Sequence, residues 1–178
     1  MTAHPAPSEF EARTNATFEA LMWALSRPGL TRDLPAPGQA GIVEALLDRE
    51  CNVHCADPDL ARIAAATGAA LVTQEQADHL FLDMLPGADA LRQIALGSDL
   101  YPETGATLVC NARLGQGAAL RISGPGCNGA VDVKVAGLPD GFWQMRARLM
   151  RYPMGFELFL VAGAQVLGVP RSSQVEVI

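Results

Sequence analysis

Apolar residues follow two different spacings along the chain, and the first is helical. Between residues 18 and 25 the apolar positions recur every three or four residues: Phe18, Leu21, Met22 and Leu25. This spacing places their side chains on one face of a helix. Ser8 and Glu11 form a capping-box pattern before this stripe. The pattern predicts a helix that begins after Ser8 and ends in the segment SRPG, residues 26–29.

Helix signals recur further along the chain. The later helices that we predict cover residues 41–49, 58–67, 87–97 and 140–150. Asp57 and Pro58 give one of them an N-cap and a proline in its first turn. Gly68 and Gly97 stand where glycine commonly closes a helix, and Asp140 opens the last one.

The second spacing is that of short, often alternating β-strands. The predicted strands cover 51–56, 70–73, 79–85, 105–112, 119–123, 131–137, 156–163 and 165–170. Helices and strands alternate early, and strands cluster late. This order favours an α/β fold, a three-layer α/β/α sandwich with a mixed sheet. We expect one domain over residues 1–178, with 1–7 as a flexible arm.

Composition limits the classes of function. The net charge is −6 and 49% of the residues are hydrophobic, so a globular chain without general affinity for nucleic acid or anionic membranes is expected. The start lacks the charged and apolar regions of a signal peptide, and no apolar run reaches the length of a membrane span. We therefore expect a cytoplasmic protein with reduced thiols.

The segment GPGCNG, residues 124–129, matches the glycine pattern of dinucleotide-binding loops. Such a loop needs a helix directly after it, with a ribose-binding acid about 20 residues on. Here the strand-like AVDVKV follows, and Gln144 stands at the acid's position. We therefore interpret the segment as a glycine-rich hairpin turn.

The segment CNVHC raises the alternative of a metal site. On a helix, Cys51, His54 and Cys55 would share one face, whereas on a strand His54 points away from the two thiols. No second pair supplies a fourth ligand, so we favour buried thiols. Cys110 and Cys127 are lone thiols without an adjacent histidine, which gives little support for a nucleophile.

Lys134 is the only lysine in the chain. An enzyme that uses pyridoxal phosphate needs a lysine for its Schiff base. By strand parity Lys134 lies with Asp132 on the face opposite the valines, which is typical of a solvated strand face. An autonomous pyridoxal-phosphate enzyme is therefore the weakest alternative, and we expect no cofactor.

Two arginine-containing segments are candidates for anion or partner contacts. Arg146, Arg148 and Arg151 lie at the end of a predicted helix, where positive charge complements the helix dipole. The alternative is contact with a phosphate or a partner's carboxylate. Arg171 with Ser172 and Ser173 combines a guanidinium with two hydroxyls, which suits phosphate oxygens.

Several segments together resemble one family, the PhnH subunit of the bacterial carbon–phosphorus lyase system. They are FEALMWALSRPG (18–29), GATL (105–108), ISGPG (122–126), YPMGFELFL (152–160) and GVPRSSQVEV (168–177). Their order and spacing are similar to those of the family over nearly the whole chain. Three positions depart from its usual residues: Glu19, Cys127 and Glu157.

The resemblance implies a fold similar to the large domain of pyridoxal-phosphate-dependent transferases, without the cofactor. It also implies a homodimer that joins PhnG, PhnI and PhnJ, with PhnL associating. That system makes α-D-ribose 1-methylphosphonate 5-triphosphate from ATP and methylphosphonate. PhnI is implied as the seat of that chemistry, and the resemblance assigns no catalytic residue to PhnH.

Two functional hypotheses follow. The first is a required, non-catalytic transferase subunit without stand-alone activity. The alternative is a subunit that binds a small phosphorylated ligand and completes a shared active site. Its candidate residues are Arg171, Ser172 and Ser173, with Ser26, Pro28 and Gly29 as a second wall. The terminal segment 172–178 alternates apolar and polar residues, so its exposed edge favours docking or dimer contact over catalysis.

Overall fold

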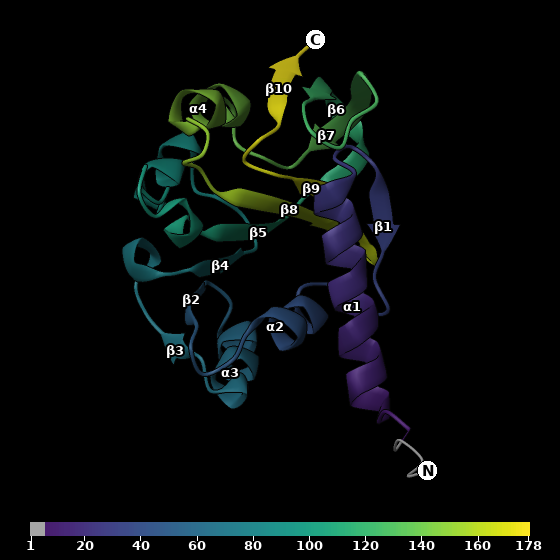
Figure 1. The fold of residues 1–178 in the computed structure, drawn as a ribbon, viewed down its shortest axis with the longest axis vertical. Helices are drawn as coiled ribbons and strands as arrows, with labels where there is room; N and C mark the ends of the chain where they lie inside the picture. The colour runs from purple at the N-terminus through teal and green to yellow at the C-terminus, as the bar shows by residue number, and fades with distance from the viewer. Residues whose placement is uncertain (1–5) are drawn as a thin grey trace.

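A mixed sheet of seven strands runs through the molecule in the computed structural model, which describes residues 6–178 (Figure 1). Its order is β1–β9–β8–β5–β4–β2–β3. The strands are β1 (Thr31–Asp33), β2 (Asn52–Cys55), β3 (Ala70–Leu71), β4 (His79–Leu82), β5 (Thr107–Asn111), β8 (Glu157–Ala162) and β9 (Gln165–Val169). Strand β9 is antiparallel to β8 and β1, whereas the other neighbours are parallel. The predicted mixed sheet is confirmed.

The central strands are buried on both faces, which explains their nearly continuous apolar sequences. In β5, Leu108 and Cys110 join one core cluster, and Val109 joins the other. Strands β4 and β8 divide their side chains in the same way. Because successive strand side chains point to opposite faces, the sheet separates two hydrophobic cores.

Three helices cover one face of the sheet: α1 (Glu9–Ser26), α2 (Ala40–Leu46) and α3 (Pro58–Thr67). They bury Leu21, Ile42, Val43 and Ala64 against the sheet. Asp57 accepts hydrogen bonds from the first turn of α3, and Gly68 closes this helix in the left-handed region with φ of 93°. The predicted ends of this helix are therefore confirmed.

The layer on the opposite face differs from the prediction of a purely helical layer. It contains α4 (Phe142–Leu149), the 3₁₀ helix η2 (Ala88–Gln93) and a separate sheet of three strands, β6 (Arg113–Ser123), β7 (Ala130–Ala136) and β10 (Gln174–Val177). The small sheet has the order β10–β6–β7 (Figure 1). The apolar faces of its strands, such as Leu120 and Ile122, pack onto the large sheet in place of helices.

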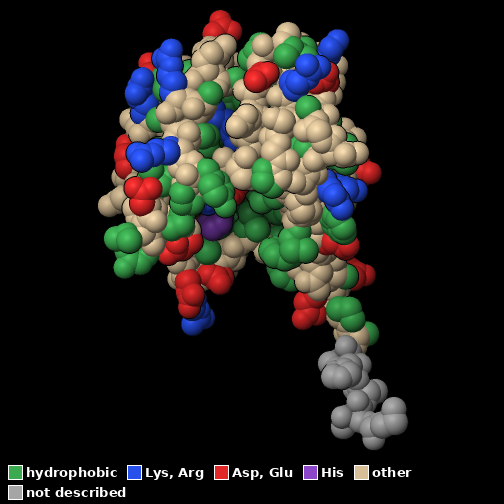
Figure 2. Space-filling view, turned by 45° about the horizontal axis from the view of Figure 1, so that its top comes forward, with side chains coloured by type: hydrophobic (Ala, Val, Ile, Leu, Met, Phe, Trp, Pro, Cys, Tyr) green, Lys and Arg blue, Asp and Glu red, His purple; other side chains and the backbone are tan. Residues whose placement is uncertain are grey.

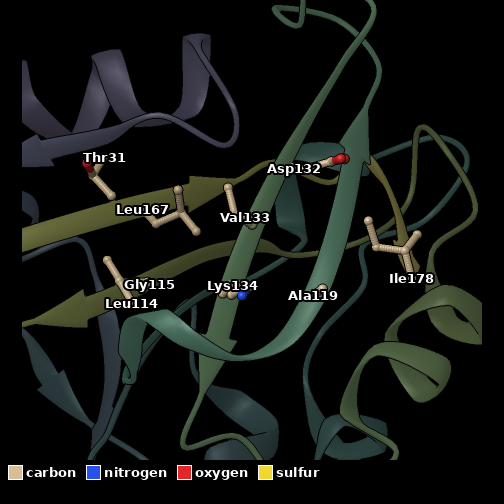
Figure 3. Close-up of a pocket in the computed structure, with 9 residues that line it drawn as sticks. All are labelled: Thr31, Leu114, Gly115, Ala119, Asp132, Val133, Lys134, Leu167 and Ile178. Atoms are coloured by element: carbon tan, nitrogen blue, oxygen red, sulfur yellow. The ribbon is translucent and has the colours of Figure 1, made fainter.

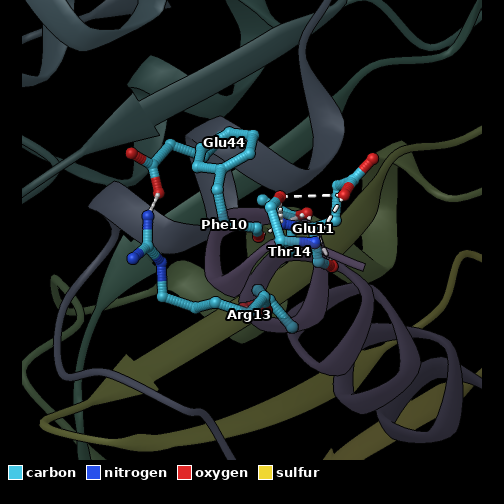
Figure 4. Close-up of polar contacts among 7 residues, drawn as sticks. Phe10, Glu11, Arg13, Thr14 and Glu44 are labelled. Carbon is cyan, nitrogen blue, oxygen red and sulfur yellow. Dashed lines mark hydrogen bonds and ion pairs between the residues drawn. The ribbon is translucent and has the colours of Figure 1, made fainter. Parts of the chain in front are cut away.

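Helix α1 begins as the sequence predicts. The Glu11 backbone N–H donates to Ser8 Oγ at 3.2 Å, and the Ser8 N–H donates to Glu11 Oε2 at 2.7 Å. Two residues after Glu11, Arg13 Nη2 donates to Glu44 Oε2 at 3.1 Å, which ties α1 to α2 (Figure 4). The described part of the predicted arm is residues 6 and 7, and residues 1–5 lie outside the described chain.

The prediction of an α-helix over 87–97 is wrong. The segment forms only η2, and Ala95 and Leu96 then leave the helical path. The Ala106 N–H donates to the Ala95 carbonyl at 2.8 Å, and the Gly155 N–H donates to the Leu96 carbonyl at 2.8 Å. These long-range partners use the carbonyls that would continue a helix, so tertiary pairing overrides local propensity.

The sequence did not predict β1, and Phe18 and Met22 of the predicted apolar stripe of α1 are exposed. The remaining predictions differ mainly at element ends. Residues 124–129 form the hairpin turn between β6 and β7, as predicted, and the terminal strand is confirmed as β10. Helix α4 starts two residues after Asp140, with Gly141 at its N-cap in the left-handed region. Within residues 6–178, none of the helices combines the length and the apolar character needed to cross a bilayer.

Candidate functional site

The predicted site residues Arg171, Ser172 and Ser173 form a tight turn between the two sheets. Strand β9 of the large sheet ends just before it, and β10 of the small sheet begins just after it. The Ser173 N–H donates to the Pro170 carbonyl at 2.9 Å and closes the turn. The turn is therefore held on rigid elements at both ends.

Arg171 is fixed by an ion pair within the chain. Its Nε donates to Glu157 Oε1 at 2.6 Å, and its backbone N–H donates to Glu157 Oε2 at 2.9 Å. Its Nη1 also donates to the Pro102 carbonyl. The Arg171 and Glu157 side chains are only 15% and 21% exposed. The guanidinium therefore positions the turn against the start of β8, and the carboxylate of Glu157 already balances its single positive charge.

Arg146 holds the same turn from the other side, a role that the sequence did not reveal. Its side chain is 2% exposed. Nη1 donates to the Ser173 carbonyl at 3.2 Å and Nη2 donates to the Pro170 carbonyl at 2.8 Å. Burial lowers the pKa of Arg146 to about 10, so the side chain remains a cation at neutral pH. The predicted interaction with the helix dipole is therefore not the only role of Arg146, because its side chain also holds the turn.

A cavity of about 350 Å³ lies between α4 and this turn. It is lined by residues that include Arg146, Tyr152, Arg171, Ser172 and Ser173. Two buried polar atoms at this place, Arg146 Nε and Ser173 Oγ, make no hydrogen bond with any described residue. The cavity is thus bordered by two arginines and two serines, the chemistry that suits an anionic oxygen.

The segment 26–29 does not line this cavity but lies on the far side of the β6–β7 turn. A Cβ atom on Gly126 would come within 2.3 Å of the Ser26 carbonyl, and one on Gly124 within 3.0 Å of the Ser172 carbonyl. Cys127 Sγ also approaches the Pro28 carbonyl at 3.7 Å. The glycine turn therefore packs between the two predicted walls, as a spacer that requires glycine.

Basic side chains near the end of α4 remain accessible. Arg148 and Arg151 are exposed, and Lys and Arg side chains gather at the upper left of Figure 2, among acidic ones. These are surface charges, in contrast to the buried Arg146. They are available for contact with a partner's carboxylates.

Neither Lys134 nor a cysteine lines the cavity at this turn. Burial raises the pKa of Cys55 to about 11 and of Cys110 to about 12, so both stay protonated at neutral pH. Residues 6–178 contain no group of three or more His, Cys, Asp or Glu side chains arranged to hold a metal ion. Lys134 lines a separate cavity of about 530 Å³ beside Val133 and Leu167 (Figure 3).

Comparison with known proteins identifies the family. The model of a family described as bacterial phosphonate metabolism protein (PhnH) matches residues 7–176. The chain belongs to the PhnH family.

Two curated relatives cover nearly the whole chain. The C-P lyase subunit protein HtxG of Stutzerimonas stutzeri is 30% identical, over 98% of this chain and 94% of its own. The α-D-ribose 1-methylphosphonate 5-triphosphate synthase subunit PhnH of Rhizobium meliloti (strain 1021) is 31% identical, over 94% and 91%.

The PhnH match confirms the resemblance that the sequence segments indicated. It also includes the whole Pro170–Ser173 turn, together with Arg146 and Glu157, which hold it. The sequence signal that marked this turn was the Arg-Ser-Ser run itself. No comparable signal marked Arg146, because a buried arginine in an amphipathic helix looks like any other charged position.

Proposed function

We propose that this chain is a required, non-catalytic subunit of a carbon–phosphorus lyase core complex. In this role it supports formation of α-D-ribose 1-methylphosphonate 5-triphosphate from ATP and methylphosphonate. The observation that carries the proposal is the PhnH family match over residues 7–176. A relative named as a subunit of that synthase aligns over 94% of this chain, which adds support.

The proposal includes the partners that the family resemblance implies. The chain would act as a cytoplasmic homodimer that joins PhnG, PhnI and PhnJ, with PhnL associating. Its fold would be similar to the large domain of pyridoxal-phosphate-dependent transferases. The exposed Arg148 and Arg151, near the end of α4, provide accessible cations for such contacts.

Growth on methylphosphonate as sole phosphorus source tests the role directly. A strain without this gene is expected to stop growing, and a plasmid copy is expected to restore growth. Growth of the same strain on inorganic phosphate is the control. Growth on methylphosphonate without the gene, in a strain with no second copy, would overturn the proposal.

A second candidate function rests on the cavity beside Arg171. Two guanidinium groups and the unpartnered Ser173 Oγ meet there, which suits a small phosphorylated ligand. Calorimetric titration with ATP and with methylphosphonate tests it on the isolated chain and on the complex. Binding that Arg171→Ala removes supports this candidate. Absence of heat, together with full activity of Arg171→Ala in the complex, excludes it.

Glu157→Gln sharpens this test, because it removes the carboxylate that balances Arg171. If Arg171 binds an anion, the substitution is expected to strengthen anion binding. If Arg171 only holds the turn, the substitution is expected to lower stability and leave anion binding absent. The two roles therefore predict different outcomes of the same titration: stronger anion binding in one case and no anion binding in the other.

A further inference from the structure

Polar side chains gather at the carboxyl ends of three parallel strands, a place that the sequence predictions did not include. Asp83 follows β4, Asn111 ends β5, and Asp57 lies beyond the end of β2. With Gln39, which precedes α2, they line a cavity of about 230 Å³. These residues come from separate parts of the chain and meet only in the folded protein.

The strand connections place this cavity at the point where the order of the strands in the sheet reverses direction. The chain leaves β2 toward β3 on one side, whereas the next strand, β4, pairs with the other side of β2. In open α/β sheets, the crevice at such a reversal, outside the carboxyl ends of the strands, is where ligands bind. Asp57 and Asp83, which follow the two strands on either side of the reversal, both line the cavity.

Hydrogen bonds fix the orientation of the amide groups. Gln39 Nε2 donates to the Leu82 carbonyl and to Asn111 Oδ1, each at 3.0 Å. Because a backbone carbonyl only accepts, the nitrogen of Gln39 must point toward Leu82. Asn111 Nδ2 in turn donates to Asp83 Oδ1 at 2.5 Å. The chain of bonds thereby orients the Asp83 carboxylate at the cavity.

One acceptor in this chain of bonds is left without a donor. Gln39 is only 5% exposed, and its Oε1 accepts no hydrogen bond from any described residue. Buried polar atoms in native proteins nearly always have a partner, because an unpaired one retains its desolvation cost. Gln39 lines the cavity, so a ligand hydroxyl or an ordered water that donates a hydrogen bond to Oε1 would remove this cost.

The charge of the lining defines the class of ligand. The cavity has two carboxylates, Asp57 and Asp83, and neither Lys nor Arg lines it. Asp57 Oδ1 already accepts from the N–H groups of Asp59 and Leu60. A phosphate or carboxylate ligand would be repelled here. The volume is below the range of about 300–1,000 Å³ for drug-sized ligands, which suits a group as small as a sugar.

We propose that this cavity binds the vicinal hydroxyl groups of a sugar. The Asp83 carboxylate and Gln39 Oε1 are the acceptors, and Asn111 is a positioning residue that orients Asp83. The inference concerns the isolated chain and does not depend on the subunit role proposed above. A failed binding test would leave that role untouched, just as a failed growth test would leave this site untouched.

Nuclear magnetic resonance of the ¹⁵N-labelled chain tests the site with defined probes. Adenosine is expected to shift the side-chain amide signals of Gln39 and Asn111 in a saturable way. Its control, 2′,3′-dideoxyadenosine, lacks both hydroxyls and is expected to bind at least about tenfold more weakly.

Equal binding of the two nucleosides, or no saturable shift at millimolar adenosine, overturns the proposal. So does saturation by methylammonium without any response to adenosine. Inorganic phosphate is expected to have no effect.

Substitutions locate the binding on the chain. Asp83→Asn is expected to weaken adenosine binding about tenfold, whereas Asp99→Asn, the same charge change outside the cavity, is expected to leave it unchanged. Gln39→Met removes the unpaired acceptor and is expected to abolish binding. If Gln39→Met does not fold, Asp83→Asn decides alone, because Asp83 is exposed at the strand end. Wild-type affinity in Asp83→Asn overturns the proposal.

Discussion

Arg146 shows how much a single side chain can determine in this fold. It is a cation, yet it is among the largest fully buried side chains of the described chain. Its two Nη donors bond to the carbonyls of Pro170 and Ser173, about 25 residues further on in the sequence. Arg171 is held from the opposite side by Glu157. Two arginines thus fix one turn, each through two hydrogen bonds of its guanidinium.

Replacing the buried arginine is expected to be costly. Arg146→Met leaves the Ser173 carbonyl without a donor and removes one of the two donors of the Pro170 carbonyl, so we expect a loss of about 2–4 kcal/mol in the free energy of unfolding. Urea denaturation measures this loss. The control is Arg148→Met on the same helix, where the side chain is exposed and the expected change is within about 0.5 kcal/mol. Equal effects of the two substitutions would contradict the bonding role of Arg146.

The ion pair between Arg171 and Glu157 is expected to be stronger than the surface pairs. A double-mutant cycle with Arg171→Met and Glu157→Gln should give a coupling free energy of about 1–3 kcal/mol, because both groups are mostly buried. The same cycle on Arg92 and Asp89, whose side chains are 59% and 85% exposed, should give less than about 1 kcal/mol. Comparable values for the two pairs would show that burial adds nothing here.

The buried thiol of Cys110 predicts how stability depends on pH. Burial raises the pKa of Cys110 from an ordinary value of 9.0 to about 12. Above pH 9 the unfolded chain therefore loses a proton that the folded chain keeps, which favours unfolding as the pH rises. We expect the free energy of unfolding to fall by up to about 1.4 kcal/mol per pH unit from this group. Cys110→Ala should reduce that slope in urea titrations between pH 8 and about 10.5. An unchanged slope would exclude the thiol as its source.

At the scale of elements, the β6–β7 turn explains why the glycines of GPGCNG are needed. Gly126 and Gly129 both have positive φ, at 87° and 79°. A Cβ on Gly126 would collide with the end of α1, whereas a Cβ on Gly129 would meet no atom within 4 Å. A substitution at Gly129 therefore tests backbone strain alone, whereas a substitution at Gly126 tests backbone strain together with close packing.

Alanine substitutions exploit this difference. Gly129→Ala should cost about 1–2 kcal/mol through the left-handed conformation alone. Gly126→Ala should cost a further 1–3 kcal/mol or so, since the turn and residues 26–29 must move apart. Thermal and urea unfolding of the two variants measure the difference. Similar losses would mean that the close approach of the turn to Ser26 is not tightly held.

At the scale of the whole molecule, the proposed role requires an assembly. We expect the purified chain to elute as a dimer in size-exclusion chromatography with light scattering. Co-expressed with PhnG, PhnI and PhnJ, it should move into one large stoichiometric complex. Exchanging the exposed Arg148 and Arg151 for glutamate tests whether these cations contact a partner. A chain that remains separate from the other subunits would contradict the proposed role.

The sequence alone determined the local features of this protein. The capping box at Ser8 and Glu11, the cap at Asp57, the closing Gly68 and the hairpin at 124–129 were all predictable, because each depends on residues within one turn of each other. The order of the predicted helices and strands indicated the mixed sheet. The segments shared with the PhnH family were also readable without a structure.

Only the tertiary structure decided what depends on distant pairing. It placed β6, β7 and β10 in a separate sheet, and it turned 87–97 away from a helix through the partners of Ala95 and Leu96. It also buried Arg146 and brought Gln39, Asp83 and Asn111 to one cavity. Local sequence carries the preferences of neighbouring residues. Hydrogen-bond partners that are many residues apart are chosen only when the strands and helices pack together.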